Sequence, residues 1–140
     1  MKSDYRCWDL KKREMIYGLI LKSGDADIKI CGAPHLLFMM STQMPDVHGD
    51  IAHEYDIVCQ KGTGIIYIVG WQECTAGFRF VPLEFWDEPK LDQKIIPTYT
   101  MQQMFQNPNG YEIVGNAIAN DVWVKNKKKE MRNKRNGRNN

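Results

Sequence analysis

The chain has 140 residues, and its 43% hydrophobic and 11% aromatic content suits the core of one domain while excluding a second large one. The N-terminal MKSDYRCWDL has no apolar segment typical of a signal peptide, and no run approaches the roughly 18 apolar residues of a membrane span. We therefore expect an intracellular protein. Residues 125–140 contain eight Lys or Arg and one Glu, so their net charge is +7. Because the whole chain has a net charge of +2, residues 1–124 carry a net charge of −5.

The first forty residues predict β-structure. Tyr5–Trp8 alternates like a strand, and a charged turn leads to a hairpin partner over Met15–Leu21. Asp27–Cys31 predicts a third short strand. The apolar run His35–Met40 is short for a helix, so a strand is favoured there as well.

Residues 49–80 predict the three-stranded meander around which the chain is organised. Ile57–Cys59 is the first strand, and Phe78 with Phe80 marks the third. Ile65–Trp71 has apolar residues on both faces, which predicts a central strand that is covered on both sides. The turn before this strand contains two glycines that permit a positive φ, Gly62 and Gly64.

The C-terminal third predicts one short helix, a closing strand and a tail. Met101–Gln106 has apolar residues at i, i+3 and i+4 behind a capping threonine, so it is the one helix expected before the tail. Asn107–Gly110 is a turn signal, and Tyr111–Val114 is the closing strand. Val122–Val124 is the last apolar cluster, and residues 125–140 predict a basic, disordered tail.

Four segments, in this order, carry a family resemblance. Arg6-Cys7-Trp8-Asp9 with Lys12 and Met15 resembles R-x-W-D-x-x-x-K-x-M. The block M-Q-Y-T-G-L-x-D-x-x-G-x-x-x-x-E-G-D-I-V is matched by Met39, Thr42, Asp46, Gly49, Glu54, Asp56, Ile57 and Val58. The motifs Y-x-V-x-W and G-G-F are matched by Tyr67, Trp71, Gly77 and Phe78. The motif Y-E-V-I-G-N-I-x-x-N resembles Tyr111 to Asn116 with Ile118 and Asn120.

Together these segments resemble the YopX-like family, uncharacterised proteins of temperate phages and prophages. The resemblance implies an SH3-like β-roll or barrel with an additional N-terminal β portion, located in the cytoplasm of the bacterial host cell. It implies no reaction, cofactor or binding site. Gln43 and Tyr55 stand where the family has glycine, and Tyr55 is expected to disfavour the positive φ that glycine permits.

The expected organisation is therefore a single mainly β, YopX-like domain over residues 1–124 with one short helix. Residues 1–40 form its N-terminal β portion and residues 49–120 form the SH3-like roll. Residues 125–140 form the tail.

Several residues suit metal binding or catalysis, but structural roles explain them as well. Six residues that could bind a metal crowd into eleven positions, namely His48, His53, Asp46, Asp50, Glu54 and Asp56, yet they lack a paired ligand motif. Asp50 and Asp56 suit turn capping or a soluble strand edge equally well, so a structural role is favoured over a metal site. Cys7, Cys31, Cys59 and Cys74 are widely spaced, so reduced thiols are favoured over disulfides or zinc. A nucleophilic Cys59 or Cys74 would require a nearby histidine base. The chain has no phosphate-binding loop or dinucleotide motif, so we expect no enzyme, cofactor or metal.

Two binding hypotheses follow. The first is a non-enzymatic accessory or regulatory protein that binds an unknown protein partner or, through exposed strand edges, a second copy of itself. Its aromatic side chains suit such a role, and Trp86 beside an acidic turn is the tryptophan expected to be partly exposed. The alternative is a nucleic-acid-associated protein whose tail cations contact phosphates, namely Lys125, Lys127, Lys128, Lys129, Arg132, Lys134, Arg135 and Arg138.

Overall fold

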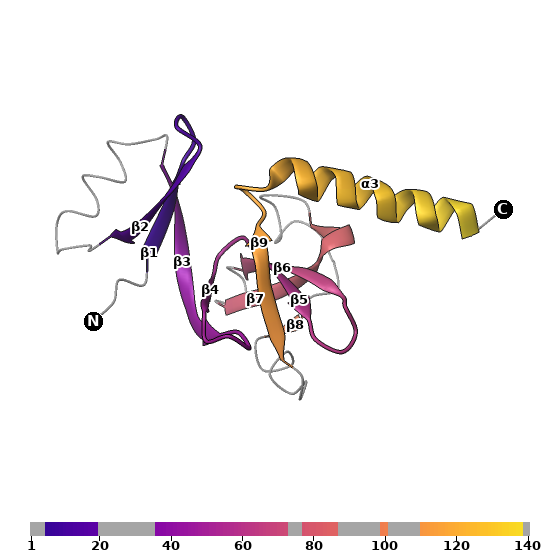
Figure 1. The fold of residues 1–140 in the computed structure, drawn as a ribbon, viewed down its shortest axis with the longest axis horizontal. Helices are drawn as coiled ribbons and strands as arrows, with labels where there is room; N and C mark the ends of the chain where they lie inside the picture. The colour runs from indigo at the N-terminus through magenta and orange to yellow at the C-terminus, as the bar shows by residue number, and fades with distance from the viewer. Residues whose placement is uncertain (1–4, 20–35, 73–76, 87–98, 101–109, 139–140) are drawn as a thin grey trace.

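A computed structural model of the protein describes residues 5–19, 36–72, 77–86, 99–100 and 110–138 (Figure 1). The strands are β1 (Tyr5–Asp9), β2 (Glu14–Leu19), β3 (Leu36–Pro45), β4 (Ile51–His53), β5 (Asp56–Gln60), β6 (Ile66–Gln72), β7 (Gly77–Pro82), β8 (Tyr99–Thr100) and β9 (Tyr111–Asn116). They form antiparallel sheets ordered β2-β1-β3-β4 and β8-β7-β6-β5-β9. A 3₁₀ turn, η2 (Leu83–Phe85), and an α-helix, α3 (Asp121–Arg138), complete the described elements. The predicted mainly β, barrel-like fold is confirmed. The predicted strand Asp27–Cys31 and helix Met101–Gln106 lie outside the described residues.

The N-terminal hairpin forms as predicted, with β1 and β2 paired from Asp9 and Glu14 outward. The Asp9 carboxylate closes its turn, because Oδ1 accepts hydrogen bonds from the backbone N–H of Lys11 at 2.9 Å and of Lys12 at 3.0 Å. The N–H of Arg13 donates to the Asp9 carbonyl oxygen at 2.7 Å. The tip of the hairpin is therefore a defined turn whose side chains project from a fixed backbone.

Strand β3 links the two sheets. Its first half pairs with β1, and its second half pairs with β4, where Ser41 lies opposite His53. The N-terminal sheet consequently continues past residue 40, at which the sequence placed the end of the N-terminal portion. Figure 1 shows β3 passing from the hairpin to the curled five-stranded sheet.

Strand β6 lies at the centre of the five-stranded sheet, between β5 and β7, as the apolar residues on both of its faces predicted. Tyr67 and Val69 pack on one face with Phe80 and Tyr111. Ile68 packs in a second cluster, which also contains Ile57, Val81, Leu83, Trp86 and Val124. The sheet therefore has apolar packing on both sides.

Gln43 and Tyr55, which stand where the motif that the chain resembles has glycine, still adopt positive φ angles of 60° and 71°. The expectation that Tyr55 would avoid this conformation is wrong. Its N–H donates to the Val69 carbonyl at 2.8 Å, its carbonyl accepts from the Ala117 N–H at 2.7 Å, and its ring meets Trp86 edge-on at 6.0 Å. These contacts offset a backbone cost of about 1–2 kcal/mol. Gly62 and Gly64 have the positive φ angles predicted for them, 95° and 72°.

The predicted disorder of the basic segment is also corrected, because residues 121–138 form α3. Val124, Lys128 and Met131 recur at i, i+4 and i+7 and so share one face of the helix. Val124 is buried in the core cluster, Met131 packs against it, and Lys128 Nζ donates to the Trp86 carbonyl oxygen. No helix in the described part of the chain has the length and apolar character that a membrane crossing requires.

Trp86 was expected to be partly exposed, but its side chain is only 6% exposed. It lies at the end of η2, where α3 and the Tyr55 ring contact the same cluster. Trp123, in the first turn of α3, is 41% exposed instead.

Candidate interaction surface

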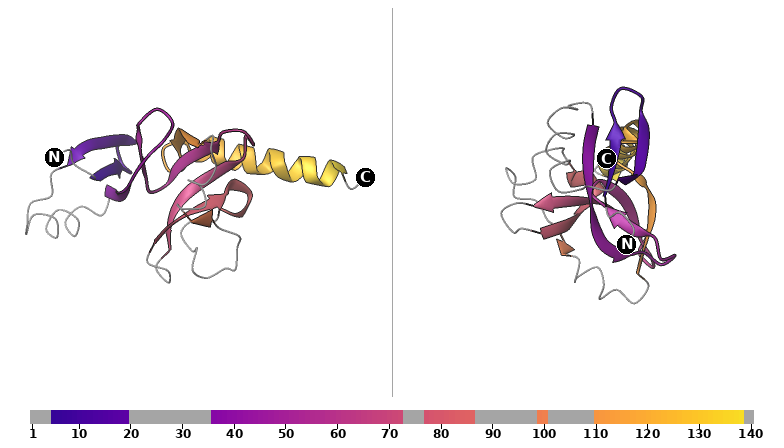
Figure 2. Two further views of the ribbon diagram at one scale, coloured as in Figure 1. Left: turned by 90° about the horizontal axis from the view of Figure 1, so that it is seen from below. Right: turned by 90° about the vertical axis from the view of Figure 1, so that its left-hand side faces the viewer.

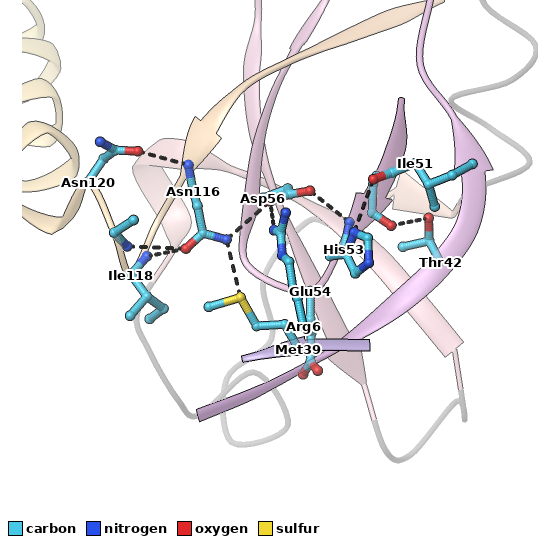
Figure 3. Close-up of polar contacts among 12 residues, drawn as sticks. Arg6, Met39, Thr42, Ile51, His53, Glu54, Asp56, Asn116, Ile118 and Asn120 are labelled. Carbon is cyan, nitrogen blue, oxygen red and sulfur yellow. Dashed lines mark hydrogen bonds and ion pairs between the residues drawn. The ribbon is translucent and has the colours of Figure 1, made fainter. Parts of the chain in front are cut away.

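A buried polar cluster joins the N-terminal sheet to the roll (Figure 3). Asp56, at the start of β5, is 1% exposed and forms an ion pair with Arg6 Nη2 of β1. Its Oδ1 also accepts a hydrogen bond from Asn116 Nδ2 at 3.1 Å, and its Oδ2 accepts one from the His53 N–H at 2.7 Å. A buried carboxylate needs such partners, so this cluster determines how β1 docks on the five-stranded sheet.

Asn116 extends the same cluster to the beginning of α3 (Figure 3). Its Oδ1 accepts hydrogen bonds from the N–H groups of Ile118 at 3.0 Å and Ala119 at 3.2 Å. Asn120 Oδ1 accepts one from the Asn116 N–H at 3.0 Å. A Cβ on Gly115 would lie 3.0 Å from Asn120 Oδ1, which explains the small residue there. The turn that starts α3 is therefore tied to the Arg6–Asp56 pair.

The exposed side of α3 presents a row of cations. Lys125, Lys129 and Arg132 recur at i, i+4 and i+7, and all three are exposed. This row, here called the cation row, lies beside the stripe through which α3 packs on the roll. The helix thus displays positive charge from a defined position, as Figures 1 and 2 show for the projecting helix.

The other predicted phosphate contacts have different surroundings. Lys128 contacts Trp86, as described above. Lys127 and Lys134 pair with Glu130 at 3.7 Å and 3.5 Å, respectively. The last two predicted phosphate contacts, Arg135 and Arg138, also lie in α3, but the structure does not describe their side chains.

The residues weighed as metal ligands do not converge on one point. Asp56 belongs to the buried cluster, and Glu54 Oε1 accepts a hydrogen bond from the Met40 N–H at 3.2 Å. His48 Nε2 lies 3.1 Å from Glu112 Oε1, and His53 Nδ1 lies 3.1 Å from the Ile51 carbonyl oxygen. Among the described residues, no group of three or more His, Cys, Asp or Glu is arranged to bind a metal.

Asp46 closes the β3–β4 turn and ties it to β9. Its Oδ1 accepts from the N–H groups of His48 at 2.9 Å and Asp50 at 3.0 Å, and its Oδ2 accepts from the Ile113 N–H at 3.0 Å. Burial raises the pKa of Asp46, but these backbone hydrogen bonds and the nearby His48 outweigh it and lower the pKa below its ordinary 3.8. The folded state therefore favours the ionised carboxylate.

Replacing Asp46 with Asn should lower the free energy of unfolding at pH 7 by about 1–3 kcal/mol, because the amide leaves the Ile113 N–H without an acceptor. Since folding lowers the Asp46 pKa, the carboxylate contributes its stability above the ordinary value of 3.8 and loses it as the pH falls through the folded value. The difference between wild type and D46N should consequently shrink in acid. Urea denaturation at neutral pH and near pH 3 measures it, with exposed Asp50→Asn as control. A difference that is constant with pH would contradict this account.

The Cys7 thiol lies in surroundings that oppose its ionisation. Burial, with a smaller contribution from the Asp9 charge, raises the pKa of the Cys7 thiol. Cys59 Sγ lies 3.9 Å from the Gln60 carbonyl oxygen. Nucleophilic thiols require a lowered pKa, so Cys7 is unsuited to that role. Cys74 lies outside the described residues.

A pocket of about 220 Å³ lies where β9 meets α3. It is lined by Ile57, Val114, Gly115, Asn120 and Trp123. Val114 is 51% exposed and has no partner in the β5–β9 register, because a bulge interrupts that pairing. No sequence motif predicts this pocket, although the apolar cluster Val122–Val124 lies at its edge in the sequence.

The buried Arg6–Asp56–Asn116 cluster was also not predicted, although each member lies in a motif of the resemblance. Arg6 and Asp56 are fifty residues apart, and no local sequence pattern indicates that two such distant charges form an ion pair. The one hint of this cluster in the sequence is that its three members are polar residues beside apolar strand residues, namely Arg6, Asp56 and Asn116.

No protein-family model matches the chain, and the comparison with curated protein sequences found no match either. Among solved structures, the crystal structure of protein EF1440 from Enterococcus faecalis is similar, with a TM-score of 0.56 and 15% sequence identity. The similarity covers 86% of this chain and 96% of that one. At such low identity the comparison concerns the fold alone. The chain is thus similar in its overall fold to EF1440.

Proposed function

We propose that the protein is a non-enzymatic, nucleic-acid-associated protein that contacts phosphates through α3. The observation that supports this is the cation row, because it places Lys125, Lys129 and Arg132 on one exposed face of an ordered helix. Over 18 residues, α3 has eight Lys or Arg against two acidic residues. Cations that neutralise phosphates release counterions, which yields affinity without sequence preference.

The packing of α3 adds to this argument. A disordered tail loses conformational entropy when it binds, whereas a helix that is already packed loses less. Val124 and Met131 attach α3 to the roll, and the Asn116 turn positions its start. Residues 1–124 carry a net charge of −5, so most of the surface outside α3 disfavours contact with a polyanion, and binding should be centred on the helix.

The test is a titration of a fluorescein-labelled, mixed-sequence DNA duplex, followed by fluorescence anisotropy at several salt concentrations. The variant K125Q/K129Q/R132Q should bind more weakly, and the slope of log K against log salt should fall by about 3, near one unit per cation. The matched control V47E/I51E/I65E makes the same change in net charge at exposed apolar residues outside α3. Absence of wild-type binding at low salt, or equal binding by the α3 variant, would exclude this function.

A protein partner is the second candidate, and the pocket at the β9–α3 junction favours it. Val114 and Trp123 are both partly exposed around a pocket of about 220 Å³, while a cavity of about 150 Å³ accommodates a benzene ring. Exposed aromatic side chains beside pockets are typical of protein-interaction hot spots.

This candidate is tested with a photo-crosslinking amino acid at Val114 and, as control, at Ile65, which is 47% exposed. Gln60 lies opposite Tyr111, the first residue of β9, and the Gln60 N–H donates to the Ile65 carbonyl oxygen. Ile65 therefore lies near the end of β9 that is farther from the pocket. In extracts of the source cells, a discrete product from position 114 that is lost in W123A supports a partner at the pocket. Equal products from both positions would count against it, and a product of twice the chain mass in purified protein would identify a second copy.

We further propose that the chain is a YopX-like protein of phage or prophage origin. The matched segments occur in order, and several matched residues form structural contacts: Arg6, Asp9, Asp46, Asp56 and Asn116. Residues that form structural contacts are the ones that a family with a shared fold is expected to keep in its motifs. The structure of an established YopX-like protein without an equivalent Arg–Asp–Asn cluster would argue against this lineage.

A further inference from the structure

We propose that the tip of the β1–β2 hairpin belongs to the same nucleic-acid-binding surface as α3, with Lys11 and Lys12 as its phosphate contacts. This inference rests on the proposed function and extends it to a segment more than one hundred residues away in the sequence. The two segments meet at an ion pair, in which Arg13 Nη2 lies 3.4 Å from Asp121 Oδ1. Lys11 and Lys12 directly precede Arg13, and both are exposed.

The ion pair places the hairpin tip on the side of α3 where the cation row begins. Asp121 and Lys125 are four residues apart on a helix, so they lie on the same face. In Figures 1 and 2 the turn between β1 and β2 lies toward the start of α3 in each view. The hairpin lysines therefore extend the positive charge of the cation row beyond the first turn of the helix.

The hairpin is also fixed relative to the roll. The Asp9 carboxylate defines the turn, and the buried Arg6–Asp56 pair attaches β1 to β5. Asn116 connects that pair to the turn that starts α3. One polar cluster thus positions both cationic segments, and binding does not require them to be brought together.

The composition of this surface favours nucleic acid over an acidic protein. Protein interfaces are depleted of Lys and enriched in aromatic residues, whereas nucleic-acid interfaces are strongly cationic. Four of the five cations are Lys: Lys11, Lys12, Lys125 and Lys129, with Arg132 as the fifth. Trp123 lies about 160° around the helix from Lys125, so it is not on the cation row. Contact with phosphates alone predicts binding without sequence preference.

The experiment compares wild type with K11Q/K12Q on the same labelled duplex, with anisotropy measured from low to physiological salt. The salt slope should fall by about 2, near one unit for each lysine. Arg13 is unchanged, so its ion pair with Asp121 remains. The matched control V47E/I65E lowers the net charge by the same two units at exposed residues elsewhere, and it should leave the slope unchanged. Circular dichroism and thermal unfolding verify that both variants fold.

The outcomes separate this inference from the function on which it rests. If wild type binds DNA and the cation-row variant weakens binding while K11Q/K12Q has the wild-type slope, the hairpin is not part of the surface. If wild type does not bind, the proposed function itself is wrong. Displacement of the duplex by polyglutamate at equal charge concentration would overturn the assignment to nucleic acid and favour an acidic protein. A fall in slope for K11Q/K12Q but not for V47E/I65E supports the inference.

Discussion

Replacing Asp56 with Ala is expected to lower the free energy of unfolding by about 3–5 kcal/mol. Asp56 is 1% exposed, and its removal leaves the Arg6 guanidinium, on a side chain that is only 13% exposed, without its counter-charge. It also removes the acceptor of hydrogen bonds from Asn116 Nδ2 and the His53 N–H. A buried charge or N–H without a partner is costly, because its interaction with water is lost and not replaced.

Chemical denaturation followed by circular dichroism measures this loss. Asp56→Asn retains an oxygen acceptor and should lose less stability than Asp56→Ala, so it provides a second variant if the alanine protein does not fold. Asp121→Ala is the control, since its pair with Arg13 is solvent-exposed and should contribute at most about 1 kcal/mol. Similar losses for D56A and D121A would contradict the structural importance of the buried cluster. Because Asn116 links the cluster to α3, D56A should also increase amide hydrogen exchange in the first turn of α3.

Replacing Phe80 with Ala should have an effect of similar size, about 3–5 kcal/mol, for a different physical reason. Phe80 is fully buried in β7, and its ring meets Tyr67 at 6.5 Å and Tyr111 at 5.5 Å in edge-on geometry. The substitution removes apolar surface from the core, leaves a cavity, and ends two aromatic contacts worth about 0.5–1.5 kcal/mol each.

Urea unfolding of F80A is compared with that of Phe85→Ala, since Phe85 is 37% exposed. The control should lose about 1 kcal/mol or less, because a partly exposed ring makes fewer contacts. Tyr111 and Asn116 are the first and last residues of β9, so loosening the Phe80 cluster should affect the strand that leads to α3. A loss below about 1 kcal/mol for F80A would show that the rings do not form the core of this face.

Local sequence patterns determined several strands of this protein. The alternation of apolar residues in Ile65–Trp71 correctly indicated a central strand, because side-chain direction in a strand has a period of two whatever the neighbours are. The hairpin of β1 and β2 and the closing strand β9 were predicted on the same basis. Gly62 and Gly64 have positive φ angles because glycine alone has no steric penalty there.

Tertiary contacts decided the features that these patterns missed. Residues 125–140 predict disorder by composition, yet Val124, Lys128 and Met131 pack α3 on the roll, because packing stabilises a helix that composition alone does not favour. Tyr55 adopts a positive φ and Trp86 is buried, since each is compensated by contacts with residues distant in the sequence. The candidate surface depends on such contacts throughout. The sequence alone indicated the cations of α3, but the proximity of the hairpin depends on the Arg13–Asp121 pair and the buried cluster, which exist only after long-range pairing.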